Sequence, residues 1–117
     1  MDRIDKINEA MKKEVSLIIQ EEIHDPRLEF ITITSADVSR DLQHAKVYFS
    51  VLGDAKKAQE AQAGLDSARG FIRKLVGQRI RMRYTPEIAF FYDKSIEYSA
   101  QIDDVIDRIK NELKENH

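Results

Sequence analysis

The sequence contains no cysteine and no tryptophan, and it has only two prolines and four glycines. Without cysteine the chain has no disulfide scaffold, no cysteine-ligated zinc site and no cysteine nucleophile. No apolar run approaches the roughly 18 residues of a membrane-spanning helix, and the amino-terminal residues lack the basic-then-apolar pattern of a secretory signal. We therefore expect residues 1–117 to form one soluble, cytoplasmic domain whose last few residues fray.

Charge of either sign is plentiful, but its distribution is uneven. The net charge is −2, from nineteen basic and twenty-one acidic residues. Residues 67–86, which we name the basic stretch, contain six basic residues and no acid, so the rest of the chain carries −8. A local stripe of this kind attracts a polyanion over about the Debye length, while the acidic remainder limits indiscriminate adhesion.

Apolar spacing predicts the order of elements along the chain. A stripe at three- and four-residue spacing predicts a helix over 2–22, capped by Asp2 or Asp5. Alternation predicts strands over 30–38, 45–51 and 88–92. A helical stretch over 55–77 separates the last two strands, with Asp54 as its amino-terminal cap, a break or bend near Gly70 and Gly77 as its carboxyl-terminal cap. A final helix covers 96–113.

This order indicates an α+β domain with helices packed on a small sheet. The first two strands are close enough in sequence to form an antiparallel hairpin. The helical stretch is long enough to serve as a crossover to the third strand. Along that strand, Phe90 and Tyr92 share one face and Phe91 takes the other, and at least one of these faces is expected in the core.

No enzymatic constellation is present in the sequence. Phosphate-binding glycine loops, a nucleophile elbow and the zinc motif of metalloproteases are all missing. The three histidines, His24, His44 and His117, are far apart in the sequence, and the adjacent acid pairs point to different sides of their helices. We therefore predict no catalytic residue, no metal site and no cofactor.

The basic stretch is the one feature above background, although most charged runs only solubilise a surface. Arg69 and Arg73 are one helical turn apart, with Lys74 to their side. If residues 78–84 are extended, they place three guanidinium groups on one side. Arginine binds phosphate through a planar fork and stacks on bases. The predicted nucleic-acid contacts are Arg69, Arg73, Lys74, Arg79, Arg81 and Arg83.

Six motifs, in order and with matching spacing, resemble the bacterial ribosome-binding factor A family over almost the whole chain. They are DPRL at 25–28, TIT at 32–34, VSRDL at 38–42, AKVY at 45–48, GFIR at 70–73 and RYTPEIAFFYD at 83–93. The resemblance implies a type II KH-like fold of helix, strand, strand, kinked helix, strand and helix. It also implies a helix kink of the Ala-x-Gly type, matched here by Ala68 and Gly70, in place of the GxxG clamp of ordinary KH domains.

The same resemblance implies a non-catalytic assembly factor. Such a factor binds the immature small (30S) ribosomal subunit, assists late maturation and processing of 16S rRNA, and is important at low temperature. The expected partners are the small subunit and its rRNA. Whether a GTPase or another factor triggers release stays open. We expect no membrane partner, and we expect a monomer. Three alternatives remain: a generic single-stranded RNA-binding domain, a protein-interaction module with no ribosomal partner, and a hydrolase or nuclease. The last is the weakest, because no acids or histidines cluster beside the basic stretch. The rRNA helices contacted and the affinity are left open, as is whether the last helix covers the basic face.

Overall fold

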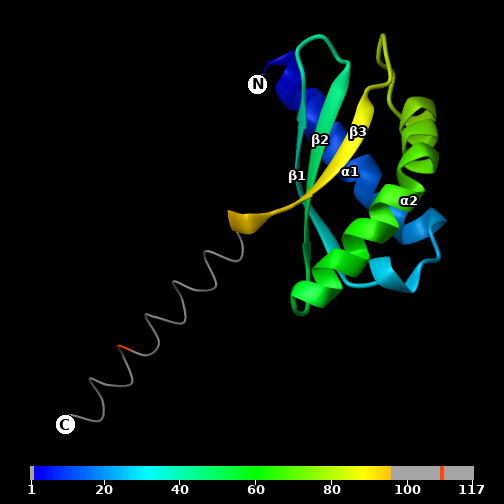
Figure 1. The fold of residues 1–117 in the computed structure, drawn as a ribbon. Helices are drawn as coiled ribbons and strands as arrows, with labels where there is room; N and C mark the ends of the chain where they lie inside the picture. Colours follow the sequence, from blue (N-terminus) through cyan, green and yellow to red (C-terminus); the bar gives the residue numbers. More distant parts are fainter. Residues whose placement is uncertain (1, 96–108, 110–117) are drawn as a thin grey trace.

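The computed structural model describes residues 2–95 and residue 109, and it shows a three-stranded sheet with two long helices packed on one face (Figure 1). The first helix crosses behind the sheet, and the second connects the last two strands. In chain order the elements are α1 (Arg3–Glu22), the 3₁₀ helix η1 (Pro26–Leu28), β1 (Ile31–Val38), β2 (His44–Val51), α2 (Ala55–Arg79) and β3 (Glu87–Tyr92).

Both helices begin at the predicted caps. The Asp2 carboxylate accepts a hydrogen bond from the Asp5 N–H at 2.9 Å, and the Asp54 carboxylate accepts one from the Lys57 N–H at 3.0 Å. Each cap satisfies one of the amide groups that a helix leaves unpaired at its start, which stabilises the helix by about 1 kcal/mol. The start of each helix is therefore determined by its local sequence.

The sheet has the order β1-β2-β3, with β1 antiparallel to β2 and β2 parallel to β3. The hairpin and the crossover were both predicted, and both are confirmed. A bulge interrupts the first pairing between Ile33 and Ser35. The helix-strand-strand-helix-strand order with a mixed sheet is the arrangement expected of a type II KH-like domain.

The core lies between the sheet and the two helices. Along β2 the residues Ala45, Val47 and Phe49 are buried, whereas His44 and Lys46 on the other face are exposed. Each large side chain buried here contributes about 1.5–3 kcal/mol. From the helices the fully buried apolar residues are Met11, Val15, Ile18, Ala61, Leu65, Ile72 and Val76. Both helices therefore cover the same face of the sheet.

The aromatic residues divide between the two faces as predicted. Phe90 is buried in the core, whereas Phe91 is 43% exposed on the uncovered face of the sheet. There the Phe91 ring lies beside the Tyr48 ring of the neighbouring strand, with 5.9 Å between the ring centroids. The core prediction is confirmed for the Phe90 face.

Of the two outcomes predicted near Gly70, a break or a bend, the break is wrong, because α2 is continuous from Ala55 to Arg79. The prediction that Gly77 caps its end is also wrong: the cap is Ile80, whose N–H donates to the Val76 carbonyl at 2.9 Å. Figure 1 shows α2 changing direction along its length. The assignment of a kink to Ala68 and Gly70 stays a prediction.

The predicted last helix, over 96–113, lies outside the described residues except for residue 109. Among the helices that the structure describes, none combines the length and apolar character needed to span a bilayer.

Candidate nucleic-acid interface

The predicted contacts lie on two adjoining segments, the second half of α2 and the connection to β3. Arg69, Arg73, Lys74 and Arg79 belong to α2, whereas Arg81 and Arg83 lie in the connection. The expectation of an extended arm over 78–84 is wrong, because Arg79 is helical and residues 81–86 form no strand. The reason is that α2 continues two residues beyond Gly77. Arg79, Arg81 and Arg83 therefore do not lie on one strand and are not aligned on one side by strand geometry.

Gly77 allows the connection to pack tightly on α2. A Cβ atom placed on Gly77 would come 2.8 Å from the Thr85 hydroxyl oxygen, which is closer than a Cβ atom normally approaches another heavy atom. Only glycine leaves room for this contact. The connection to β3 is therefore pressed against the last turns of the helix.

Arg73 fastens the same connection through all three of its guanidinium nitrogens. Its Nη2 and Nε donate to the carbonyl oxygens of Thr85 at 2.9 Å and Pro86 at 3.1 Å. Its Nη1 lies 3.2 Å from the Glu87 carboxylate. Because the planar fork of arginine matches this set of acceptors, Arg73 holds the entry to β3 in place. A phosphate would have to compete with three existing contacts for this side chain.

Arg79 is also engaged within the protein. Its guanidinium lies 3.5 Å from the Glu14 carboxylate and 3.3 Å from the Glu22 carboxylate, both on α1. Its side chain is 26% exposed. Arg79 therefore links the end of α2 to α1, and its positive charge is balanced by these two carboxylates and is not available to a phosphate.

The other four predicted contacts are exposed and form no ion pair among the residues that the structure describes. Lys74 and Arg69 lie on α2, and Arg81 and Arg83 lie in the connection. We name these four side chains the α2–loop surface. The basic stretch thus divides into two cations that hold the local structure and four that face solvent.

Two further residues beside these cations were not predicted as site residues. Tyr84 is 48% exposed, and the Arg83 guanidinium carbon lies 5.4 Å from the centroid of its ring, which is a cation–π contact. Phe71 on α2 is 46% exposed. Next to it Gly70 is exposed, and a Cβ atom on it would meet nothing within 4 Å. The position of Phe71 in the helix could have identified it as exposed. It is six residues from the buried Leu65, which does not match the three-, four- or seven-residue spacing of a buried stripe.

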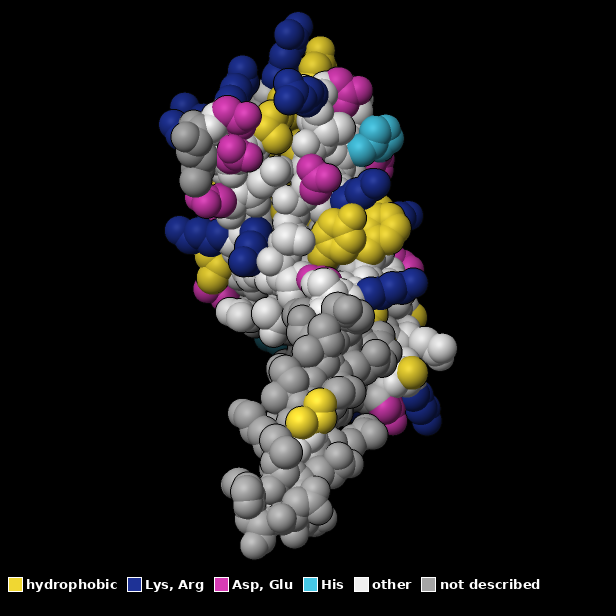
Figure 2. Space-filling view, turned by 90° about the vertical axis from the view of Figure 1, so that its left-hand side faces the viewer, with side chains coloured by type: hydrophobic (Ala, Val, Ile, Leu, Met, Phe, Trp, Pro, Cys, Tyr) yellow, Lys and Arg dark blue, Asp and Glu magenta, His cyan; other side chains and the backbone are white. Residues whose placement is uncertain are grey.

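Arg40 was not among the predicted nucleic-acid contacts, because it lies far from the basic stretch in the sequence. Figure 2 shows Lys and Arg side chains gathered at the upper end of the molecule, where Figure 1 places the β1–β2 turn and the connection between α2 and β3. The two are joined by a hydrogen bond from the Glu87 N–H to the Gln43 carbonyl at 2.9 Å. Arg40 lies exposed in that turn, so it adds a cation at this end of the molecule.

The chemistry that this surface offers is binding to anions. Its charges are guanidinium and ammonium groups, which hold phosphate oxygens by charge-assisted hydrogen bonds. Its exposed rings offer faces on which bases stack. Among residues 2–95 and residue 109, no group of three or more His, Asp or Glu side chains is arranged to hold a metal ion.

Comparison with known proteins gives consistent relatives. Residues 3–106 match the family model described as Ribosome-binding factor A. Ribosome-binding factor A of Halothermothrix orenii is 48% identical over 110 residues, which cover 94% of this chain and 90% of that protein. Ribosome-binding factor A of Desulfitobacterium hafniense strain DCB-2 is 46% identical over 110 residues, covering 94% of this chain and 88% of the relative.

Solved structures agree with the sequence comparison. The crystal structure of ribosome-binding factor A from Thermus thermophilus aligns with a TM-score of 0.70 at 23% identity, covering 78% of this chain and 97% of that chain, which shows the shared fold. A homology model of the Thermus thermophilus factor, fitted into the cryo-EM map of a 30S complex of that protein, aligns with a TM-score of 0.60 at 25% identity, covering 73% of this chain and 89% of that one. The fold is therefore KH-like, and the chain belongs to the ribosome-binding factor A family.

Proposed function

We propose that this protein is a non-catalytic assembly factor that binds the immature small ribosomal subunit and assists late maturation of its 16S rRNA. Membership of the ribosome-binding factor A family supports the proposal. A structural neighbour whose coordinates were fitted into the map of a 30S complex supports the choice of subunit. The protein would bind rRNA through phosphate contacts and shape, with no bond made or broken.

The observation that carries this proposal is that the cations of the basic stretch have two different roles: two hold the local structure and four face solvent. Arg73 and Gly77 fix the connection against α2, so the cations at positions 69, 74, 81 and 83 are presented on a rigid scaffold. Pre-set positions reduce the entropy lost when RNA binds. The α2–loop surface is therefore suited to a structured RNA of fixed shape.

The absence of a GxxG clamp is consistent with this mode of binding. The four glycines stand at 53, 64, 70 and 77, so no GxxG sequence occurs. In our proposal the bare backbone at Gly70 lets an RNA strand approach α2 closely, while Phe71 and Tyr84 offer ring faces to unpaired bases. Recognition would then depend on the surface of a folded RNA and not on four clamped nucleotides.

Maturation follows in this proposal from differential binding. A factor that binds one rRNA conformation more tightly than its competitors shifts the population toward that conformation. It dissociates when the mature subunit no longer offers the same site. Misfolded RNA helices persist longer in the cold, so a factor of this kind matters most at low temperature.

The proposal is tested by reversing the charge of the two cations in the connection. We expect Arg81→Glu with Arg83→Glu to weaken binding to purified small subunits by about tenfold or more, because two phosphate contacts become repulsive. Lys12→Glu with Lys13→Glu is the matched control, since it makes the same charge change at exposed positions of α1. Co-sedimentation measures binding, and circular dichroism checks that both variants fold.

Equal loss in the two double variants would contradict the proposed site, because net charge alone would then explain binding. A competition arm separates the proposed function from generic RNA binding. Labelled protein is first bound to small subunits. Added unlabelled small subunits should then displace it, whereas random oligonucleotides at the same total phosphate concentration should not. Displacement by both to the same extent would overturn the ribosomal assignment.

A further inference from the structure

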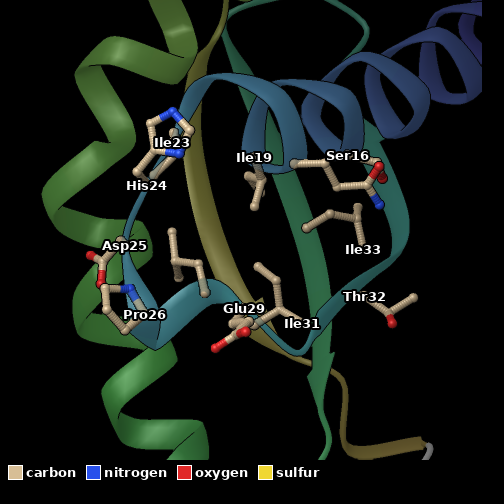
Figure 3. Close-up of a pocket in the computed structure, with 12 residues that line it drawn as sticks. Ser16, Ile19, Ile23, His24, Asp25, Pro26, Glu29, Ile31, Thr32 and Ile33 are labelled. Carbon is tan, nitrogen blue, oxygen red and sulfur yellow. The ribbon is translucent and has the colours of Figure 1, made fainter.

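A pocket of about 510 Å³ lies between the carboxyl-terminal half of α1, η1 and the start of β1 (Figure 3). None of the elements that line it carries the α2–loop surface. Its volume falls in the range of natural ligand pockets. We name it the β1 pocket, and its apolar lining residues are Ile19, Ile23, Leu28, Ile31 and Ile33.

The wall of the pocket formed by η1 is fixed against α2. Gly64 is buried there, and a Cβ atom on it would come 2.9 Å from the Leu28 side chain. The Asp25 carboxylate caps η1 through the Arg27 N–H at 3.0 Å and pairs with the Arg27 guanidinium at 2.8 Å. These contacts lower the pKa of Asp25 through its hydrogen bonds to Arg27. The pocket is therefore preformed.

The pocket reaches the free edge of the sheet. β1 is an edge strand, and the Leu52 N–H donates to the Phe30 carbonyl at 3.2 Å, which turns the backbone of Phe30 toward β2. Because these groups alternate along an antiparallel strand, the N–H and C=O of Ile31 point away from β2. Figure 3 shows the Thr32 side chain pointing away from those of Ile31 and Ile33, so a pocket lined by all three extends around the strand edge.

At the other end of the β1 edge, an outward backbone group already has a hydrogen-bond partner. There the Val38 N–H donates to the Asn8 side-chain oxygen on α1 at 2.8 Å. In the part of the chain that the structure describes, no such bond engages the outward backbone of Ile31 or Ile33. An exposed edge of this kind is a template for an added strand.

The surroundings of the pocket are electronegative. The last turn of α1 contains no basic residue and ends in Glu21 and Glu22. Glu22 is paired with Arg79 of α2, whereas Glu21 is exposed and forms no ion pair among the described residues. The partial negative charge of a helix carboxyl terminus adds to the charge of Glu21. Glu29, exposed at the rim, is a further acid and forms no ion pair among the described residues. The charge at this edge therefore complements a cationic chain.

From these three features we infer that the β1 pocket and the adjoining strand edge bind an extended, basic segment of a protein partner. The segment adds a short strand beside Ile31 and Ile33 and places one apolar side chain in the pocket. Its basic residues lie near Glu29 and the end of α1. The contacts involve no residue of the α2–loop surface, so one molecule could hold RNA and a basic protein extension at the same time.

The inference is tested on the full-length protein without RNA, so its outcome is independent of the proposed function. The probe is a capped heptapeptide alternating lysine and valine, titrated into ¹⁵N-labelled protein and followed by amide chemical shifts. We expect saturable shifts confined to residues that line the β1 pocket. A peptide alternating glutamate and valine should bind at least about tenfold more weakly, because its charges are repelled.

Two controls separate strand addition from simple charge attraction. A lysine–valine peptide with N-methylated amides along one edge should lose most of its binding, since it cannot complete the ladder. Glu29→Lys should weaken binding of the unmodified peptide about fivefold. Ile31→Pro removes an outward N–H that an edge strand does not need for its own pairing, and it should abolish binding.

The inference is overturned by shifts spread over the whole acidic surface, or by equal binding of the methylated and unmodified peptides. It is also overturned if the pocket amides shift with protein concentration in the absence of peptide, because the occupant would then be a second copy of this chain. Glu29→Lys keeps the test valid should Ile31→Pro fail to fold.

Discussion

At the residue scale, Arg73 shows why a cation in a basic stretch need not be a ligand contact. Its three guanidinium nitrogens are bonded to Thr85, Pro86 and Glu87. Arg69, one helical turn earlier, is exposed and forms no ion pair among the described residues. Two arginines of similar sequence context therefore have different tasks: one positions the connection, and the other faces solvent.

Conservative replacement distinguishes these tasks. We expect Arg73→Lys to lower the free energy of unfolding by about 1 kcal/mol, because lysine keeps the charge but loses the fork that reaches two carbonyls. It should also weaken binding to small subunits. Arg69→Lys is the matched variant and should leave stability unchanged. Urea unfolding and co-sedimentation measure the two effects; equal stability of both variants would show that Arg73 does not hold the connection.

Asp93 provides a second prediction at this scale, concerning pH. Its carboxylate accepts hydrogen bonds from Ser95 and from the Thr34 hydroxyl, and these bonds lower its pKa below the usual 3.8. Its contribution to stability is therefore present above pH 3.8 and is lost as the pH falls through the lowered value. We expect Asp93→Asn to be less stable than the parent protein near neutral pH and to approach it in acid.

Urea unfolding of both proteins from about pH 6 to about pH 2.5 tests this expectation. A stability difference that stays constant over that range would mean that the carboxylate charge plays no part in the contact with Thr34.

At the element scale, α2 contains glycines with opposite surroundings. Gly77 is pressed against Thr85, whereas nothing lies within 4 Å of a Cβ placed on Gly70. Alanine favours a helix interior over glycine by about 0.5–1 kcal/mol. The same substitution at the two positions should therefore have opposite effects on stability.

We expect Gly70→Ala to raise the free energy of unfolding by about 0.5–1 kcal/mol and Gly77→Ala to lower it by about 1 kcal/mol, since the clash outweighs the propensity gain. Thermal unfolding of the two variants measures the signs. If Gly70→Ala also weakens binding to small subunits while stabilising the fold, close approach of RNA to α2 is supported. Stabilisation by Gly77→Ala would contradict the tight packing of the connection.

Much at this scale could be predicted from the sequence, because the signals are local. The apolar stripe and the cap at Asp2 predict α1, and alternation predicts the hairpin. The end of α2 could not be predicted in this way. Gly77 has the properties of a helix cap in sequence, but its contact with Thr85, eight residues later, requires glycine for a different reason. Tertiary packing outweighs local propensity at that point.

At the scale of the whole molecule, charge is separated between surfaces of different elements. The α2–loop surface is basic, whereas the end of α1 beside the β1 pocket is acidic. The total of −2 hides this arrangement. The sequence predicts the basic stretch, but it does not show which cations remain free, because the carboxylates of Glu14 and Glu22 that engage Arg79 come from the other helix.

The salt dependence of binding to small subunits tests the central claim most directly. Each neutralised phosphate contributes about −0.7 to −0.9 to the slope of log affinity against log salt concentration, so the four cations of the α2–loop surface predict a slope of about −3 to −4. All six cations of the basic stretch would give about −4 to −5. The Arg81→Glu with Arg83→Glu variant should flatten the slope by about 2. A slope near zero, or one that this variant leaves unchanged, would contradict the account.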